Sequence, residues 1–174
     1  MGITRKILII LIFSFSFQSI LNAELPHFLD FKFILNESEA GKKAQNFLKN
    51  KLDKGIKSLK DKEKKIQEEE KKIIQQKKII SAEDYKKKVT ELRKKVSSLQ
   101  KERNTLLETV AKQRSKARTE LLKNLNPIIK KYMEDNKIRV VLDKKSILLG
   151  DVNLDLTNKI IELLNKELKS IKLN

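Results

Sequence analysis

The sequence predicts a helix-dominated α+β protein, in which a long antiparallel helical hairpin projects from a small β-rich body that ends in a C-terminal helix. Three observations predict this fold. Residues 40–125 are highly charged and rich in helix-forming residues, a turn signal divides them at residues 81–84, and strand-like apolar segments occur only near the two ends. The hairpin would span residues 38–125, and the body would be built from residues 24–37 and 126–174.

The second arm of the predicted hairpin carries a nearly continuous heptad stripe. Its positions are Tyr85, Val89, Leu92, Val96, Leu99, Arg103, Leu106, Val110, Gln113 and Ala117. Steps of four and three residues hold such a stripe against a partner helix. In the first arm apolar residues recur only every seventh position, at Leu52, Leu59, Ile66, Ile73 and Ile80. That arm therefore supplies only half of an apolar seam.

Ser81 and Asp84 resemble a capping box and place a new helix start after Ile80. The turn sets a register in which paired residue numbers sum to about 162. Four layers are then apolar on both sides: Ile73 with Val89, Ile66 with Val96, Ile56 with Leu106, and Leu52 with Val110. The layers between them match Leu with Glu or Arg, so we expect the arm to bend and splay. Gly55 would be its softest point.

Acid-to-base pairs four residues apart are expected to support the two helices of the hairpin, at about 0.2–0.5 kcal/mol each. These pairs are Asp53–Lys57, Asp61–Lys65, Glu68–Lys72, Glu83–Lys87, Asp84–Lys88, Glu91–Lys95 and Glu108–Lys112.

The predicted body draws on both ends of the chain. Residues 25–35 are rich in aromatic and branched side chains and favour a strand. Pro127 is expected to stop or kink the second helix, with a short helix resuming to residue 135. Residues 137–142 and 146–149 suggest a strand hairpin. Asp155 to Thr157 would cap a final amphipathic helix.

The N-terminus has the features of a secretory signal peptide over residues 1–23. Arg5 and Lys6 precede an apolar run of about 11 residues, which is short of the roughly 20 needed to span a bilayer, and Ala23 ends a segment of small and polar residues. The sequence contains no Cys, which excludes disulfides and thiolate metal sites. We therefore expect an exported protein.

Positive charge is concentrated in the hairpin. Residues 42–123 contain 27 Lys or Arg and 12 Asp or Glu, whereas residues 24–41 sum to −3 and residues 126–174 to +3. Such a field favours polyanions, anionic membrane surfaces or acidic protein segments, without choosing among them. Export argues against chromosomal DNA as the partner.

The residues predict no catalytic, cofactor or metal site. His27 is the only His, which excludes a His-based triad or a multi-His metal site, and it is better explained as a strand or rim residue. Glu68, Glu69 and Glu70 point in three directions on a helix and suit a solvated face. The four Gly are far apart and form no phosphate-binding loop.

The hairpin tip combines apolar and cationic residues. Ile74 and Ile79 fall off the stripe, so a folded monomer has nothing to bury them there. Lys71, Lys72 and the run that starts at Lys86 surround them. Such a surface suits a ligand that is both apolar and acidic, and a partner helix fits equally well.

The two ends of the mature chain resemble the Skp/OmpH family of periplasmic chaperones. Residues 30–44, with Asp30 and the run from Lys32 to Ala44, are similar to the strand-to-helix entry of that family. Residues 138–144 and 155–161 are similar to its closing hairpin and terminal helix. The resemblance extends from about residue 28 to 165, and the charged rod between the ends is its least specific part. Pro26 and His27 depart from the regular apolar first strand.

The resemblance implies a homotrimer in the periplasm, with three helical tentacles around a cavity. Members of the family hold unfolded outer-membrane β-barrel proteins there without ATP. The functional hypothesis is therefore an ATP-independent holdase with no catalytic residues and no cofactor. Its candidate client-binding residues are Lys71, Lys72, Ile74, Ile79, Tyr85, Lys86 and Lys87. Its candidate oligomerisation residues are Phe28, Val140, Leu142, Ile147 and Leu149.

Two other hypotheses stay open from the sequence. In the first, the chain is a structural or adaptor protein of the cell envelope whose basic arms bind anionic lipid or lipopolysaccharide. In the second, which rests on charge alone, it binds nucleic acid.

Overall fold

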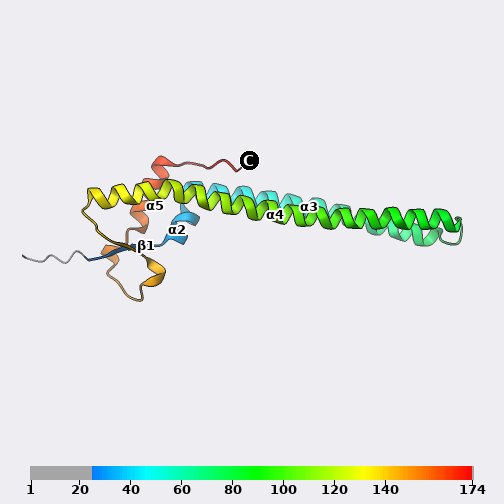
Figure 1. Cartoon of the computed structure of the whole chain (residues 1–174), viewed down its shortest axis with the longest axis horizontal. Coiled ribbons are helices and arrows are strands. Elements are labelled where there is room, and N and C mark those ends of the chain that lie inside the picture. Colours follow the sequence, from blue (N-terminus) through cyan, green and yellow to red (C-terminus); the bar gives the residue numbers. More distant parts are fainter. Residues whose placement is uncertain (1–24, 174) are drawn as a thin grey trace, which may run out of the picture.

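The protein is described by a computed structural model that covers residues 25–173. Its elements in order are β1 (His27–Leu29), α2 (Phe31–Glu37), α3 (Glu39–Gln76), α4 (Ala82–Asp135), β2 (Val141–Asp143), η1 (Lys144–Ser146), η2 (Val152–Leu154) and α5 (Thr157–Glu167). α3 and α4 form a long antiparallel hairpin that projects from a small body (Figure 1). The helix-dominated fold predicted from the sequence is confirmed. The predicted signal peptide lies outside the described residues.

The two hairpin helices, hereafter the arm, are long and polar. With 38 and 54 residues, α3 and α4 are about 57 Å and 81 Å long at 1.5 Å per residue. Within residues 25–173, no helix is both long enough and apolar enough to cross a membrane.

The arm begins at a tight corner between α2 and α3. Ser38 is fully buried, and its hydroxyl accepts a hydrogen bond from the backbone N–H of Gly41 at 3.2 Å, which caps α3. A Cβ atom at residue 41 would lie only 2.0 Å from the carbonyl oxygen of Leu35, so only Gly fits there. The corner thus depends on one buried hydroxyl and one residue without a side chain.

The predicted strand over residues 25–35 is wrong beyond Leu29. Asp30 caps a helix instead, because its carboxylate accepts a hydrogen bond from the N–H of Phe33 at 2.8 Å. In α2 the side chains of Phe31, Ile34 and Leu35 face the core, whereas Phe33 is 46% exposed. This i, i+3, i+4 spacing is helical, and a short segment rich in apolar residues does not by itself distinguish a helix from a strand.

A stop of the second helix at Pro127 does not occur, because α4 continues through it to Asp135, the predicted end of the resumed helix. Proline inside a helix costs about 3 kcal/mol. Against this cost, Leu125, Ile128 and Ile129 are buried on either side of it, and each such side chain contributes about 1.5–3 kcal/mol. Burial of these three residues therefore outweighs the local penalty.

These residues belong to the main core, where α4 packs against α2 and α5. Its buried members are Leu29, Ile34, Leu125, Ile128, Ile129, Leu156, Ile160 and Leu164. The core therefore sits at the junction of arm and body, and the end of α4 is one of its walls.

α4 ends in a Schellman motif rather than at a proline. The N–H of Ile138 donates to the carbonyl of Met133 at 2.8 Å, and the N–H of Lys137 donates to that of Glu134 at 3.3 Å. Lys137 has φ 58°, a left-handed value usually found at Gly. The motif turns the chain back toward the strands.

The two strands of the body, β1 and β2, pair in parallel. The predicted hairpin between residues 137–142 and 146–149 is wrong. β1 and β2 align His27 with Val141, Phe28 with Leu142 and Leu29 with Asp143. After β2 the carboxylate of Asp143 accepts a hydrogen bond from the N–H of Lys145 at 3.1 Å, which starts the short helix η1. Residues 147–151 then form no strand. The Asp side chain offers the backbone a local alternative to strand pairing.

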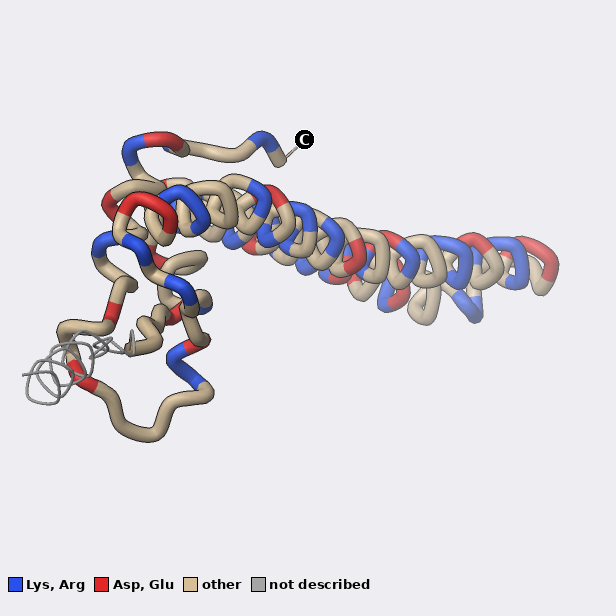
Figure 2. Tube along the Cα trace, turned by 60° about the vertical axis from the view of Figure 1, so that its left-hand side comes forward, with Lys and Arg blue, Asp and Glu red and all other residues tan. Residues whose placement is uncertain are grey.

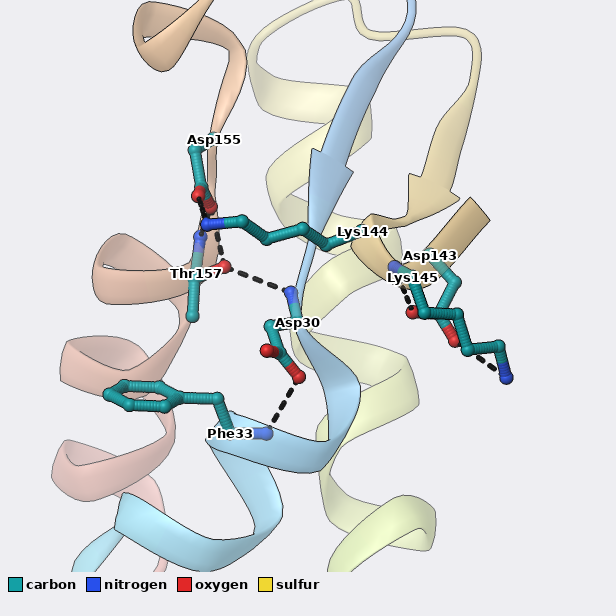
Figure 3. Close-up of polar contacts among 7 residues, drawn as sticks. All are labelled: Asp30, Phe33, Asp143, Lys144, Lys145, Asp155 and Thr157. Carbon is teal, nitrogen blue, oxygen red and sulfur yellow. Dashed lines mark hydrogen bonds and ion pairs between the residues drawn. The ribbon is translucent and has the colours of Figure 1, made fainter. Parts of the chain in front are cut away.

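A polar network joins β1, η1 and the start of α5 (Figure 3). The backbone N–H of Asp30 donates to the hydroxyl of Thr157 at 2.9 Å, and the N–H of Thr157 donates to Asp155 at 2.9 Å. Lys144 forms an ion pair with Asp155 at 2.6 Å. The network fixes the N-terminus of α5 against the first strand.

The charges of this network shift two pKa values in opposite directions. Burial alone would raise the pKa of Asp155, but hydrogen bonds from Lys144 and Thr157 outweigh it and hold this pKa below its ordinary value. The hydrogen bond and attraction between Lys144 and Asp155 raise the pKa of Lys144. Both shifts favour the charged pair in the folded state.

We expect Asp155→Ala to lower the free energy of unfolding by about 1.5–3 kcal/mol, the range for hydrogen bonds to a charged group. The substitution removes the acceptor of both Thr157 and Lys144. Urea denaturation at pH 7 measures the change. Asp61→Ala, at an exposed position on α3, is the matched control and should have little effect.

The same pair of variants gives a pH test. Because the folded-state pKa of Asp155 is depressed, its contribution is complete above its unfolded pKa of about 3.9 and is lost as the pH falls through the folded value. The difference between wild type and Asp155→Ala should therefore shrink below about pH 4. A difference that stays constant down to about pH 2 would contradict a role for the charge.

Candidate binding surface of the arm

A hydrogen-bonded turn closes the tip of the arm. The N–H groups of Ile79 and Ile80 both donate to the carbonyl of Gln76, at 2.9 and 3.1 Å. The hydroxyl of Ser81 accepts from the N–H of Asp84 at 3.0 Å and donates to its carboxylate at 2.7 Å. The predicted cap at Ser81 is confirmed. It fixes the direction in which α4 leaves the turn.

Ile74, Ile79 and Tyr85, which the sequence singled out, lie together around this turn. Ile74 is 60% exposed and Ile79 is 82% exposed. Tyr85 is half-buried, and the ammonium of Lys77 lies 5.9 Å from the centre of its ring. The tip therefore presents apolar side chains to solvent, as expected.

The tip is also strongly cationic. Residues 71–88 contain seven Lys and two acidic residues. The four candidate lysines, Lys71, Lys72, Lys86 and Lys87, are all exposed. Figure 2 shows basic residues along both helices of the arm, out to the turn. A ligand at the tip would meet apolar and basic groups within one turn of helix.

The predicted seam residues face the partner helix, but the outer arm buries them unequally. Near the body Val110 and Ala117 are buried. Farther out Leu59 and Ile73 of α3 are also buried, whereas Leu92 and Leu99 of α4 are half-buried and Val96 is 50% exposed. The outer seam is therefore buried on the α3 side and partly open to solvent on the α4 side.

Polar contacts between the helices fill the layers that lack apolar partners. Glu69 pairs with Lys95, Glu63 with Arg103, and Lys62 with Glu102. None of the seven predicted pairs along one helix forms an ion pair in the described part of the chain. Two of their Lys residues bind the facing helix instead, because Lys95 pairs with Glu69 and Lys88 donates to Gln76. Exposed pairs of this kind contribute about 0–1 kcal/mol each, so they guide the register more than they stiffen the arm.

Gly55 lies directly against the Leu106 side chain of the facing helix. A Cβ atom at this position would lie 2.5 Å from a methyl carbon of Leu106. The Leu106 side chain therefore occupies the space that any other residue would need. This contact agrees with the predicted register near Leu106.

The candidate oligomerisation residues are split between the interior and the surface of the body. Phe28 is buried, and a Cβ atom on Gly150 would lie 2.9 Å from its ring. Val140 and Leu142 are 48% and 40% exposed, and Leu149 is 90% exposed. Ile147 is half-buried. Phe28 therefore supports the body from within, while the others remain available to a partner.

The candidate oligomerisation residues leave out two exposed apolar residues of the body. Leu148 is 95% exposed and lies between η1 and η2, and Val152 is 81% exposed and is the first residue of η2. A strand over residues 146–149, as the sequence predicts, would bury every second side chain. The apolar run Ile147–Leu149 between a Lys pair and a Gly was the available signal for an exposed loop.

A family model described as outer membrane protein (OmpH-like) matches residues 27–164. The structure is also similar to a crystal structure from Caulobacter crescentus CB15, which is described as a candidate outer membrane chaperone (OmpH-like). The two share 20% sequence identity with a TM-score of 0.81, over 86% of this chain and 90% of the other. Among curated proteins, none matches this chain.

We expect Gly55→Leu to destabilise the arm by about 1–3 kcal/mol, because the new side chain competes with Leu106 for one space. Thermal unfolding followed by circular dichroism at 222 nm measures the change. Lys54→Leu makes the same substitution at the neighbouring exposed position and should leave the melting temperature nearly unchanged. Equal melting temperatures for the two variants would contradict a close approach of α3 and α4 at Gly55.

Proposed function

Because the chain belongs to the OmpH-like family of outer membrane proteins, we propose that it is a periplasmic holdase chaperone for unfolded outer-membrane β-barrel proteins. The observation that carries the proposal is the arm itself. It is a long cationic hairpin with exposed apolar residues at its tip and an outer seam that is partly open to solvent along α4.

Electrostatic steering would bring the client to the arm. Residues 42–123 carry a net charge of +15, spread over both helices (Figure 2). Opposite charge speeds the encounter of an acidic unfolded chain with the arm. The field reaches about 10 Å at 0.1 M salt, so capture should weaken as salt rises.

Many weak apolar contacts would then hold the client. Ile74 and Ile79 at the tip, with Val96 and Leu107 farther along the arm, are each at least half exposed. Single contacts of this size are weak, but several on one chain raise its residence time. A β-barrel strand held in this way is kept from pairing with the edge strand of another unfolded copy.

A homotrimer would place three arms around one client. The body offers an exposed apolar surface of Val140, Leu142, Leu148, Leu149 and Val152. Its only sheet in the described residues has two strands of three residues each, which is too small to be stable alone. Association through this surface would cover the apolar residues and extend the sheet.

We expect the mature protein to suppress aggregation of a β-barrel protein diluted from urea, without nucleotide. Light scattering measures the effect, which should weaken between 50 and 500 mM NaCl. Ile74→Ser combined with Ile79→Ser should reduce suppression several-fold while the helix content stays constant, since both side chains are exposed. Leu25→Ser, at an exposed position in the body, is the control.

Two results would argue against the proposed function. If the suppression of aggregation does not change with salt concentration, electrostatic steering is not part of the mechanism. Binding to anionic vesicles or to lipopolysaccharide, together with no effect on barrel aggregation, would favour the envelope adaptor instead.

The mass of the mature assembly in solution tests the trimer. We expect three copies by light scattering at micromolar concentration, and dissociation when Leu148 and Leu149 are both changed to Ser. Lys144 and Lys145 precede this loop, and Lys145→Ser, at an exposed position, serves as the control. A stable folded monomer of the wild-type protein would contradict the arrangement of three arms around a cavity.

A further inference from the structure

The C-terminal segment, residues 168–173, leaves α5 and runs along the base of the arm (Figure 1). Lys169 forms an ion pair with Glu39 at 3.1 Å, at the first residue of α3. Farther along, the side chain of Leu173 is 5% exposed, and Ile171 is partly buried against the same cluster. An extended segment without secondary structure is therefore held across both helices of the arm.

The segment lies in a groove between α3 and α4, which we call the base groove. Its residues are Ala44 and Leu48 of α3 with Gln113 and Ala117 of α4. The two Ala side chains are small, so they leave room for a third chain between the helices. Leu173 fills this room and completes a second apolar cluster, separate from the main core.

Gln113 binds the main chain of the segment. It is 8% exposed, and its side-chain amide donates to the backbone carbonyl of Leu173 at 2.9 Å. The amide oxygen accepts from the ammonium of Lys51 at 3.0 Å, which orients the amide. A buried Gln needs such partners, and here one of them is a backbone group that every peptide possesses.

The contacts made by the segment are tolerant of sequence. Inside the groove they consist of two apolar side chains at positions i and i+2 and one backbone carbonyl, while the ion pair of Lys169 with Glu39 is exposed and lies outside the groove. Alternate apolar side chains on one face are the property of an extended strand. Transmembrane barrel strands show the same alternation over segments of about 10 residues.

We propose that the base groove is a binding site for extended client segments with apolar residues at alternate positions, and that residues 168–173 occupy it in cis. This inference rests on the proposed holdase function and specifies one of its binding sites. The C-terminal segment lies beyond residues 27–164, which the family model matches. A client strand enters the groove by displacing the segment.

Because residues 168–173 occupy the base groove of their own chain, they lower the affinity of the groove for any other peptide. A tethered segment competes at a high effective concentration, so a free segment of equal quality binds weakly to the intact chain. A client with several suitable strands has many chances to enter. Removal of the C-terminal segment should therefore raise the affinity of the groove for a single short peptide.

The test uses a fluorescein-labelled peptide with the sequence of residues 168–174 and fluorescence anisotropy. A variant that lacks residues 169–174 should bind the peptide at least tenfold more tightly than the full mature chain. Leu173→Ser in the full chain removes the apolar anchor without shortening the chain and should give a similar increase. Circular dichroism establishes that each variant is folded.

The matched pair Ala117→Leu and Lys116→Leu locates the peptide, each made in the variant without residues 169–174. Leu at residue 117 fills the groove and should abolish binding, whereas Leu at the exposed residue 116 should leave it unchanged. Equal affinities for this pair would overturn the inference. So would the absence of peptide binding by both folded variants with a released segment.

A competition experiment separates the inference from the proposed function. An unfolded β-barrel protein should displace the labelled peptide from the shortened variant, and a peptide with its apolar residues placed next to each other should not. If the full chain suppresses barrel aggregation but the barrel protein does not displace the peptide, the groove is not a client site and the holdase function stands. If aggregation is not suppressed, both proposals fail.

Discussion

The packing of one end of α4 against α2 and α5 is the interaction on which the rest of this structure depends. Leu125, Ile34, Ile160 and Leu164 are fully buried there. The other elements of the body are too short to be stable alone, since an isolated helix of 11 residues is marginal in water and a pair of short strands is unstable. α2, α5 and both strands contribute side chains to a core that also contains the end of α4, the longest helix of the arm.

The arm changes character along its length because its two helices contribute unequally to the seam. Close to the body, small and apolar residues such as Ala44 and Ala117 bring the helices and the C-terminal segment together. Farther out, ion pairs such as Glu69–Lys95 alternate with apolar layers such as that of the buried Ile73, and solvent reaches the α4 side of the seam. Exposed ion pairs hold register weakly, so the outer arm is the part best able to adjust to a bound chain. The base remains fixed while the tip carries the exposed apolar residues.

Local chemistry explains which predictions succeeded. Ser81 caps α4 and the heptad residues face the partner helix, because capping and helical periodicity depend on neighbours in the sequence. The exposure of Ile74 and Ile79 followed from the same periodicity. The predictions that failed concern segments in which contacts between residues distant in the sequence outweigh the local preference for secondary structure. Burial of Leu125 and Ile128 carries α4 through Pro127, and the helical spacing of Phe31, Ile34 and Leu35 matches a core that only the fold creates.

The sequence by itself determined the hairpin, its turn, its charge and the apolar tip, since each is a property of a single helix or of one turn. Only the tertiary structure decided that β1 and β2 pair in parallel, that Phe28 is internal, and that Leu173 returns to the base of the arm. These features join residues more than 55 positions apart, and periodicity carries no information at that separation. Gln113 illustrates both levels. The heptad pattern placed it in the seam, and the structure gave its buried amide a backbone carbonyl to bind.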